Sequence, residues 1–129
     1  MPAIPFRAEV RGSREIATIE LHGDIDVAAE AGLGAAYADA AKLDAAAILL
    51  DFADTWYINS TGIALIVRLL ADARRDHREV RAAGLSPHYV EIFRITRLSD
   101  YVRILDGPAN AGAAAPGAAG TTSAAEAAG

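Results

Sequence analysis

The sequence predicts an α/β fold in which a mixed β-sheet begins with an antiparallel hairpin and packs against amphipathic helices. Two short segments with alternating apolar and polar residues come first, separated by a turn sequence, which is typical of a hairpin. Strand-like and helix-like segments then alternate, as in sheets whose strands are joined through helices. A chain of 129 residues is long enough for one such unit and too short for two.

The predicted hairpin comprises residues 6–11 and 16–22. Apolar and charged residues alternate along the first segment, which is the period of a half-buried strand, and Gly12 and Ser13 then supply a turn. The second segment has one apolar face and one polar face. His22 lies on the polar face, so we expect its side chain to point to solvent or to a neighbouring strand.

An aspartate precedes the first predicted helix. Asp26 stands before an alanine-rich run that ends near Lys42, and an aspartate at this position is typical of a helix N-cap. Asp24 and Asp26 would share one face if the chain were extended there, but a loop in which Asp26 caps the helix is favoured by the local pattern. Residues 46–52 form an apolar run closed by an acid and predict a central strand buried on both faces.

The second half of the chain predicts two more helices and two more strands. Apolar residues recur at helical spacing in the second helix: Ile63, Ile66, Val67 and Leu70. A short strand is expected at 80–83. Ser86 can then cap a third helix that has Pro87 in its first turn and ends near Thr96. Residues 101–105 are expected to form a last short strand.

The composition changes after residue 107. The predicted domain covers residues 1–107, and residues 108–129 are almost wholly alanine, glycine, serine and threonine. Such a segment buries too little apolar area to offset the entropy of an ordered chain. We therefore predict a disordered tail.

Composition also excludes several functional classes. With no cysteine in the sequence there can be no disulfide, thiolate nucleophile or cysteine metal site. No apolar run approaches the roughly 18 residues of a membrane span, and charged residues interrupt the first segment where a secretory signal would need apolar ones. The formal net charge of −5 argues against nonspecific nucleic-acid binding. These features predict a soluble protein in the cytoplasm.

Candidate ligand-binding motifs are few. The basic cluster 74–78 reads most simply as the solvated end of a helix, with a partner-binding patch as the alternative. His22, His77 and His88 are too far apart in the sequence for a short metal-binding motif, and the glycines form no nucleotide-binding motif. We therefore predict neither a metal ion nor a cofactor.

The segment Asn59, Ser60 and Thr61 stands directly before the second predicted helix. Each of these side chains can accept a hydrogen bond from the free amides of a helix start, so capping explains the segment on its own. A hydroxyl at a helix start is also a favourable place for a phosphate, which adds a charge of about −1.5 to −2, although the local pattern favours the cap. A hydrolase using Ser60 as nucleophile is disfavoured, because the GxSxG elbow is absent and the sequence places no histidine beside it.

Three segments, in the expected order, resemble the STAS domain family of anti-sigma-factor antagonists and sulfate-transporter domains. Residues 51–63 (DFADTWYINSTGI) are similar to the family signature, in which a buried strand ends in Asp and Asp-Ser-Ser/Thr-Gly-Leu follows. Residues 21–26 (LHGDID) resemble the Gly-x-Leu-Asp segment after the second strand. Residues 83–87 (AGLSP) resemble the Gly-Leu-Ser step before the last long helix. The resemblance covers residues 5–106.

The resemblance implies a binding module with no catalysis of its own. In antagonist members, a serine matching Ser60 is phosphorylated by the anti-sigma factor, which is a protein-serine kinase. The unphosphorylated form binds that kinase and frees the sigma factor for transcription, for example in a stress response, and a serine phosphatase restores this form. The partner-binding residues expected around Ser60 are Asp26, Trp56, Asn59, Thr61 and Gly62. We also consider a weak homodimer of this chain.

Two positions in the signature leave alternatives open. The residue before the acceptor is usually Asp in the family but is Asn59 here, and losing that charge could slow phosphorylation or favour the phosphorylated state. A constitutive scaffold, such as a subunit of a transporter or signalling complex, is therefore the alternative function. Alternation puts Trp56 and Tyr57 on opposite sides of the chain. Trp56 is either an exposed interface anchor or a cover for a sheet edge or the first hairpin.

Overall fold

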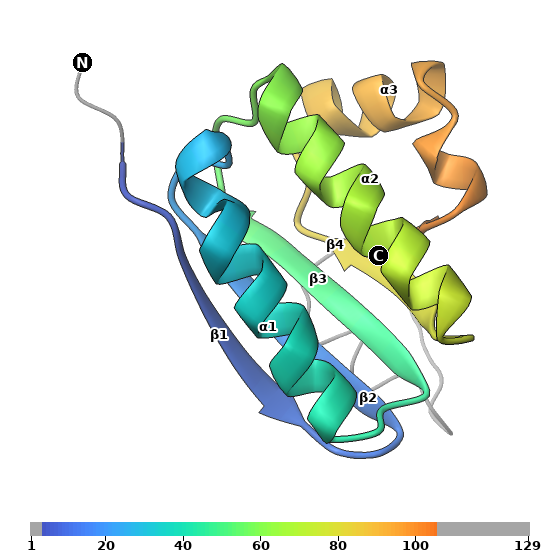
Figure 1. The fold of residues 1–129 in the computed structure, drawn as a ribbon. Helices are drawn as coiled ribbons and strands as arrows, with labels where there is room; N and C mark the ends of the chain where they lie inside the picture. Colours follow the sequence, from blue (N-terminus) through green and yellow to red (C-terminus); the bar gives the residue numbers. More distant parts are fainter. Residues whose placement is uncertain (1–3, 106–129) are drawn as a thin grey trace.

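A five-stranded sheet covered by three helices forms the fold in a computed structural model that describes residues 4–105 (Figure 1). The predicted α/β class and the N-terminal antiparallel hairpin are confirmed. The elements follow in this order: β1 (Arg7–Gly12), β2 (Ile16–His22), the 3₁₀ turn η1 (Val27–Ala29), α1 (Glu30–Lys42), β3 (Ala47–Asp54), α2 (Ser60–Arg75), β4 (Glu79–Ala83), α3 (Pro87–Ile95), the 3₁₀ turn η2 (Leu98–Asp100) and β5 (Arg103–Ile104).

The strands lie in the sheet in their order along the chain, β1-β2-β3-β4-β5. β1 is antiparallel to β2, and every later pair is parallel. Parallel neighbours are joined through helices in right-handed crossovers, and because the crossovers all advance in one direction the helices cover one face of the sheet (Figure 1). The carboxyl ends of β2 and β3 therefore meet at one edge, where α2 begins.

The main core lies between the sheet and the helices. Alternation along each strand points one set of side chains at the helices, and this set is fully or nearly fully buried: Ala17, Ile19, Leu21, Ile48, Leu50 and Phe52. Phe52 of β3 and Phe93 of α3 meet edge to face with ring centroids 6.1 Å apart. This contact holds α3 against the central strand near the edge where α2 begins.

The first and third helices begin at the predicted caps. The Asp26 carboxylate accepts a hydrogen bond of 3.0 Å from the amide of Ala28 at the start of η1, which leads into α1. The Ser86 hydroxyl accepts one of 3.3 Å from the amide of Tyr89, and Pro87 occupies the first position of α3. Each polar side chain satisfies an amide that the helix itself leaves free.

Two predicted boundaries were wrong. The first helix opens with the 3₁₀ turn η1 rather than with α-helix, and the last strand, expected at 101–105, is reduced to the two residues of β5. Arg97 has a left-handed backbone (φ 65°) and leads into η2, so the chain turns again before it reaches the sheet. The predicted tail, 108–129, lies outside the described residues.

The helices α1 and α2 lie side by side and are joined by two polar contacts. The Tyr37 hydroxyl donates a 2.6 Å hydrogen bond to Asp76, just after α2. Burial, together with this bond to a carboxylate, raises the pKa of Tyr37 to about 12. Arg68 of α2 and Glu30 of α1 form an exposed ion pair of 3.6 Å. The part-buried bond from Tyr37 to Asp76 therefore ties the end of α2 to α1, and the exposed ion pair adds little.

Two helical glycines provide a matched test of how tightly α2 is seated. A Cβ atom at Gly62 would lie 2.0 Å from the carbonyl oxygen of Ile25, whereas one at Gly34 of α1 would meet nothing within 4 Å. We expect Gly62→Ala to lower the free energy of unfolding by about 1–3 kcal/mol, because backbone must move to admit the methyl group. Gly34→Ala should raise it by up to about 1 kcal/mol through helix propensity. Urea denaturation of both variants checks this, and equal effects at the two positions would contradict the close seating of α2.

Candidate functional site

The end of α2 that carries Ser60 is fixed by backbone hydrogen bonds beyond the ends of β2 and β3. The Ile25 amide donates to the Tyr57 carbonyl at 3.0 Å, and the Asn59 amide donates to the Ile25 carbonyl at 3.2 Å. Ile25 and Ile58 thus form an isolated parallel bridge that continues the β2–β3 pairing. Because Ile25 and Ile58 are both buried, this bridge anchors the loop that leads into α2.

Asn59 is the N-cap of α2, and Ser60 is the first residue of the helix. The Asn59 side-chain oxygen accepts a 2.8 Å hydrogen bond from the Gly62 amide, and the Asn59 carbonyl accepts one of 2.9 Å from the Ile63 amide. The Ser60 side chain is exposed, and its hydroxyl makes no hydrogen bond within residues 4–105. The sequence left two roles open for Ser60: capping the helix or presenting its hydroxyl to solvent. In the structure Asn59 caps the helix, and Ser60 has the exposed hydroxyl.

The amides of Ser60 and Thr61 stand in the first turn of α2, where the helix supplies no acceptor for them. Both residues are exposed. The positive end of the α2 dipole lies at the same place, and no acidic residue stands in the first turn to offset it. An anionic group attached to Ser60 would thus meet free amide donors and a favourable potential.

Asp26 lies beside this helix start. Asp26 directly follows Ile25, and Ser60 directly follows Asn59, so both residues flank the hydrogen-bonded pair Ile25–Asn59. One oxygen of the Asp26 carboxylate caps η1. The Asp24 carboxylate accepts a bond from the amide of Ile4 at 3.1 Å. The two aspartates thus serve separate backbone amides, as the capping interpretation of this loop expected.

Exposed apolar side chains surround Ser60 on the loop and on α2. The side chain of Trp56 is 73% exposed and that of Tyr57 is 52% exposed, so the suggestion that Trp56 covers a sheet edge is wrong. Val27 of η1 is exposed as well, and on α2 the exposed residues Ala64 and Val67 follow Ser60 at helical spacing. We call this group of residues the Ser60 surface: Val27, Trp56, Tyr57, Ser60, Ala64 and Val67.

Tyr89 is a residue of the site that the sequence analysis did not identify. Its side chain is buried, and its hydroxyl lies 2.8 Å from the Ile58 amide, whose proton it accepts. The same oxygen is 3.3 Å from the Ile58 carbonyl, to which it donates. Tyr89 therefore ties α3 to the loop before Ser60. Its spacing four residues before Phe93 signals burial on a helix, but spacing does not reveal the hydroxyl's partner.

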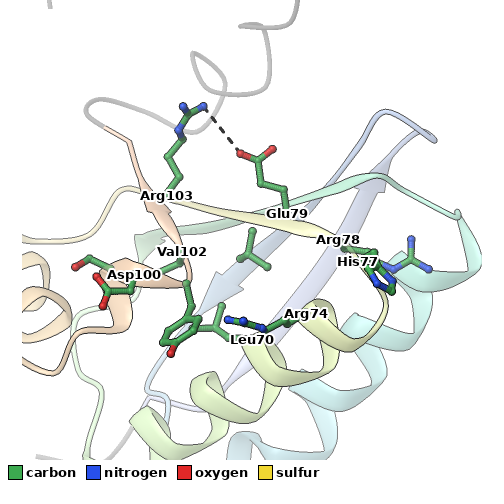
Figure 2. Close-up of a pocket in the computed structure, with 11 residues that line it drawn as sticks. Leu70, Arg74, His77, Arg78, Glu79, Asp100, Val102 and Arg103 are labelled. Atoms are coloured by element: carbon green, nitrogen blue, oxygen red, sulfur yellow. Dashed lines mark ion pairs between the residues drawn. The ribbon is translucent and has the colours of Figure 1, made fainter.

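The opposite end of α2 carries the basic cluster and a cavity of about 500 Å³ (Figure 2). Arg75 is exposed and pairs with Asp72 and Asp76, as expected of a solvated helix end. Arg78 differs from that expectation, because its guanidinium lies largely buried against the Ala45 carbonyl. The cavity lies beside Arg74, which stacks over the Tyr101 ring. It is therefore far along α2 from Ser60 and not part of the Ser60 surface.

On the face of the sheet away from the helices, the structure gathers a potential set of metal ligands. Side-chain atoms of Glu9, Glu20 and His22 lie within 4.8 Å of one another. His22 also contacts Asp54 at the end of β3, as expected for a side chain directed at a neighbouring strand. No metal site was predicted from the sequence, because His22, His77 and His88 are far apart in the chain and no cysteine accompanies them.

This arrangement agrees with a known domain family. Residues 8–106 match the family model described as Mlab, STAS domain. The chain therefore belongs to the STAS domain family, as the three motifs predicted. The comparison with curated proteins finds no match.

Solved structures of anti-sigma factor antagonists share the fold. The unphosphorylated form of the antagonist SpoIIAA is 18% identical, with a TM-score of 0.66 over 84% of this chain and 94% of that one. An antagonist from Mycobacterium paratuberculosis is 16% identical, with a TM-score of 0.61 over 77% and 84%. The phosphorylated form of the Bacillus protein SpoIIAA is 19% identical, with a TM-score of 0.62 over 84% and 96%. Within the described part of the chain, no helix has the length and apolar character needed to cross a membrane.

The Tyr89 hydroxyl offers a test of how the loop before Ser60 is held. We expect Tyr89→Phe to lower the free energy of unfolding by about 1–3 kcal/mol, because the buried Ile58 amide loses its acceptor. Hydrogen exchange of that amide should accelerate in the variant. Tyr57→Phe is the matched control, since its hydroxyl is at the surface, and it should change stability by less than about 0.5 kcal/mol. Equal stabilities of the two variants would show that Tyr89 does not hold the loop.

Proposed function

We propose that the protein is an anti-sigma-factor antagonist whose docking is controlled by phosphorylation of Ser60. In its unphosphorylated form it binds a serine-kinase anti-sigma factor and thereby releases the sigma factor. The observation that carries the proposal is the exposed Ser60 hydroxyl, which stands at a helix start already capped by its neighbour Asn59. Similarity to antagonist structures in fold and membership in the STAS family support it.

The chemistry of the Ser60 surface supports a switch based on charge. Apart from Thr61, the exposed side chains beside Ser60 are apolar: Val27, Trp56, Tyr57, Ala64 and Val67. A phosphate at Ser60 would bring a charge of about −1.5 to −2 into an interface built on these groups. Burying that charge against a partner without a compensating cation is costly. The free amides of α2 would meanwhile accommodate the phosphate in the unbound protein, so both effects favour release.

The other residues have distinct proposed roles. Trp56 supplies a large exposed side chain of the type enriched at the centres of interfaces. Asp26 and Thr61 contact the partner beside the acceptor, while Asn59 and Gly62 hold the helix start in place. In this role the protein is a cytoplasmic binding module and not an enzyme. A serine phosphatase would return it to the docking form.

A constitutive scaffold is the second candidate function, and Asn59 is the observation that favours it. Asparagine preserves the cap on α2 but lacks the negative charge of the aspartate that usually precedes the acceptor in this family. A kinase that uses this charge to orient its nucleotide or metal would phosphorylate Ser60 poorly. The same surface would then bind a transporter subunit or a signalling complex without being switched.

Phosphorylation by a cognate anti-sigma-factor kinase tests the proposal. We expect intact-mass analysis after incubation with kinase and ATP to show one added phosphate on the wild type and on Thr61→Ala, and none on Ser60→Ala. Thr61→Ala is the matched control, because it removes the adjacent exposed hydroxyl. Binding of the purified protein to the kinase should be strong before the reaction and at least tenfold weaker after it.

The variant Asn59→Asp separates the two candidates. If the wild type binds the kinase but takes no phosphate while Asn59→Asp takes one, the scaffold function holds and Asn59 is its cause. If neither protein takes a phosphate and both bind, Ser60 serves only as part of the surface. Acyl transfer to Ser60 would instead indicate an enzyme. Absence of kinase binding in every variant would reject the antagonist function itself.

A further inference from the structure

The first two strands bring two glutamates and a histidine together on the face of the sheet that the helices leave uncovered. Glu9 of β1 pairs directly with Glu20 of β2 in the antiparallel register. His22 lies two residues after Glu20 and therefore on the same face. Like charges placed directly opposite each other destabilise a strand pair, so this pair gains from nearby cations, which Arg7 and Arg11 supply in part.

The orientation of the His22 ring leaves one nitrogen available inside this cluster. Its Nδ1 atom lies 2.7 Å from the Asp54 carboxylate, which is the geometry of a donated hydrogen bond. Its Nε2 atom is inaccessible to solvent, has no hydrogen-bond partner, and lies 3.6 Å from an oxygen of Glu20. A histidine that donates from one nitrogen to a carboxylate and presents the other to a cluster of acids is the common arrangement in metal sites.

We propose that Glu9, Glu20 and His22 bind a divalent transition-metal ion of the Zn²⁺ type, with Asp54 orienting the histidine. The ligand atoms lie within 4.8 Å of one another. Metal–ligand bonds of about 2.0–2.2 Å place tetrahedral ligand atoms roughly 3.4 Å apart, so the spacing must contract, which rotation of the exposed Glu9 side chain can supply. Three protein ligands leave a position for water, as in zinc sites that are not purely structural.

Each of the two glutamates is paired with an arginine through its Oε2 atom. Arg11 donates to Oε2 of Glu20 at 2.8 Å, while Oε1 is the oxygen closest to His22. Arg7 pairs with Oε2 of Glu9 in the same manner.

The donor set selects among cations. One imidazole nitrogen and two carboxylates suit Zn²⁺, Ni²⁺ or Cu²⁺, whereas Mg²⁺ and Ca²⁺ prefer six or more oxygen ligands. The ion would join β1 and β2 to Asp54, the last residue of β3. Because the loop after Asp54 leads to Ser60, metal binding would stiffen the base of the Ser60 surface. This site is independent of whether Ser60 is phosphorylated.

Calorimetric titration of the full chain with Zn²⁺ at neutral pH tests the proposal. We expect one ion per chain in the wild type, at least tenfold weaker binding in His22→Ala and in Glu20→Gln, and a 10–100-fold loss in Asp54→Asn. His77→Ala is the matched control, because it removes an exposed histidine outside the cluster. It should bind as the wild type does. Circular dichroism of each variant verifies that it is folded.

A second readout distinguishes a metal site from an ion pair between protonated His22 and the acids. Co²⁺ bound through His22 should give visible absorption bands that disappear in His22→Ala, and Mg²⁺ should not compete for the site. Absence of Zn²⁺ binding by the wild type would overturn the proposal. Binding that survives in His22→Ala, or that is lost equally in His77→Ala, would overturn it as well.

Discussion

The structure around Ser60 depends on the backbone of Ile25. Its amide and carbonyl are both engaged, by Tyr57 and Asn59, and the first turn of α2 rests on its carbonyl at Gly62. The loop before α2 therefore cannot shift without breaking buried hydrogen bonds, each of which leaves an unsatisfied polar group. Tyr89 adds a side-chain bond to the same loop from α3. The helix start is consequently held by the backbone of Ile25 and by the Tyr89 side chain of α3.

A rigid helix start is compatible with the proposed switch, in which phosphorylation of Ser60 changes the charge of the surface but not the backbone. The Asn59 side chain caps α2, so the helix start does not depend on the Ser60 hydroxyl. We therefore expect a modification of Ser60 to leave the helix intact. In the proposed function, the apolar groups of the Ser60 surface would supply the area for docking, and the free amides would supply a place for an anion. In the proposed function the same fold is thus compatible with both states, and the partner's affinity distinguishes them.

Local rules predicted the strands, the helices and the capping roles of Asp26 and Ser86, because each follows from periodicity or from a few neighbouring residues. They could not choose between Asn59 and Ser60 as the cap of α2, since both side chains can accept the bond. Local rules did not predict two contacts, because each joins residues from different elements. These are the bond between Tyr89 and Ile58 and the proximity of Glu9 to His22. The final strand was shortened by the left-handed turn at Arg97, which its arginine side chain did not signal.

We propose that a phosphate at Ser60 changes the charge of the Ser60 surface without moving the backbone of Ile25, Ile58 and Gly62 that supports it. Hydrogen exchange measured by NMR on protein carrying encoded phosphoserine at position 60 tests this most directly, by comparison with the unmodified protein. We expect unchanged protection of the Ile25, Ile58 and Gly62 amides, with chemical-shift changes concentrated in the first turn of α2. Loss of protection at these amides would contradict the proposal, because the phosphate would then act by unfolding the backbone that supports the surface.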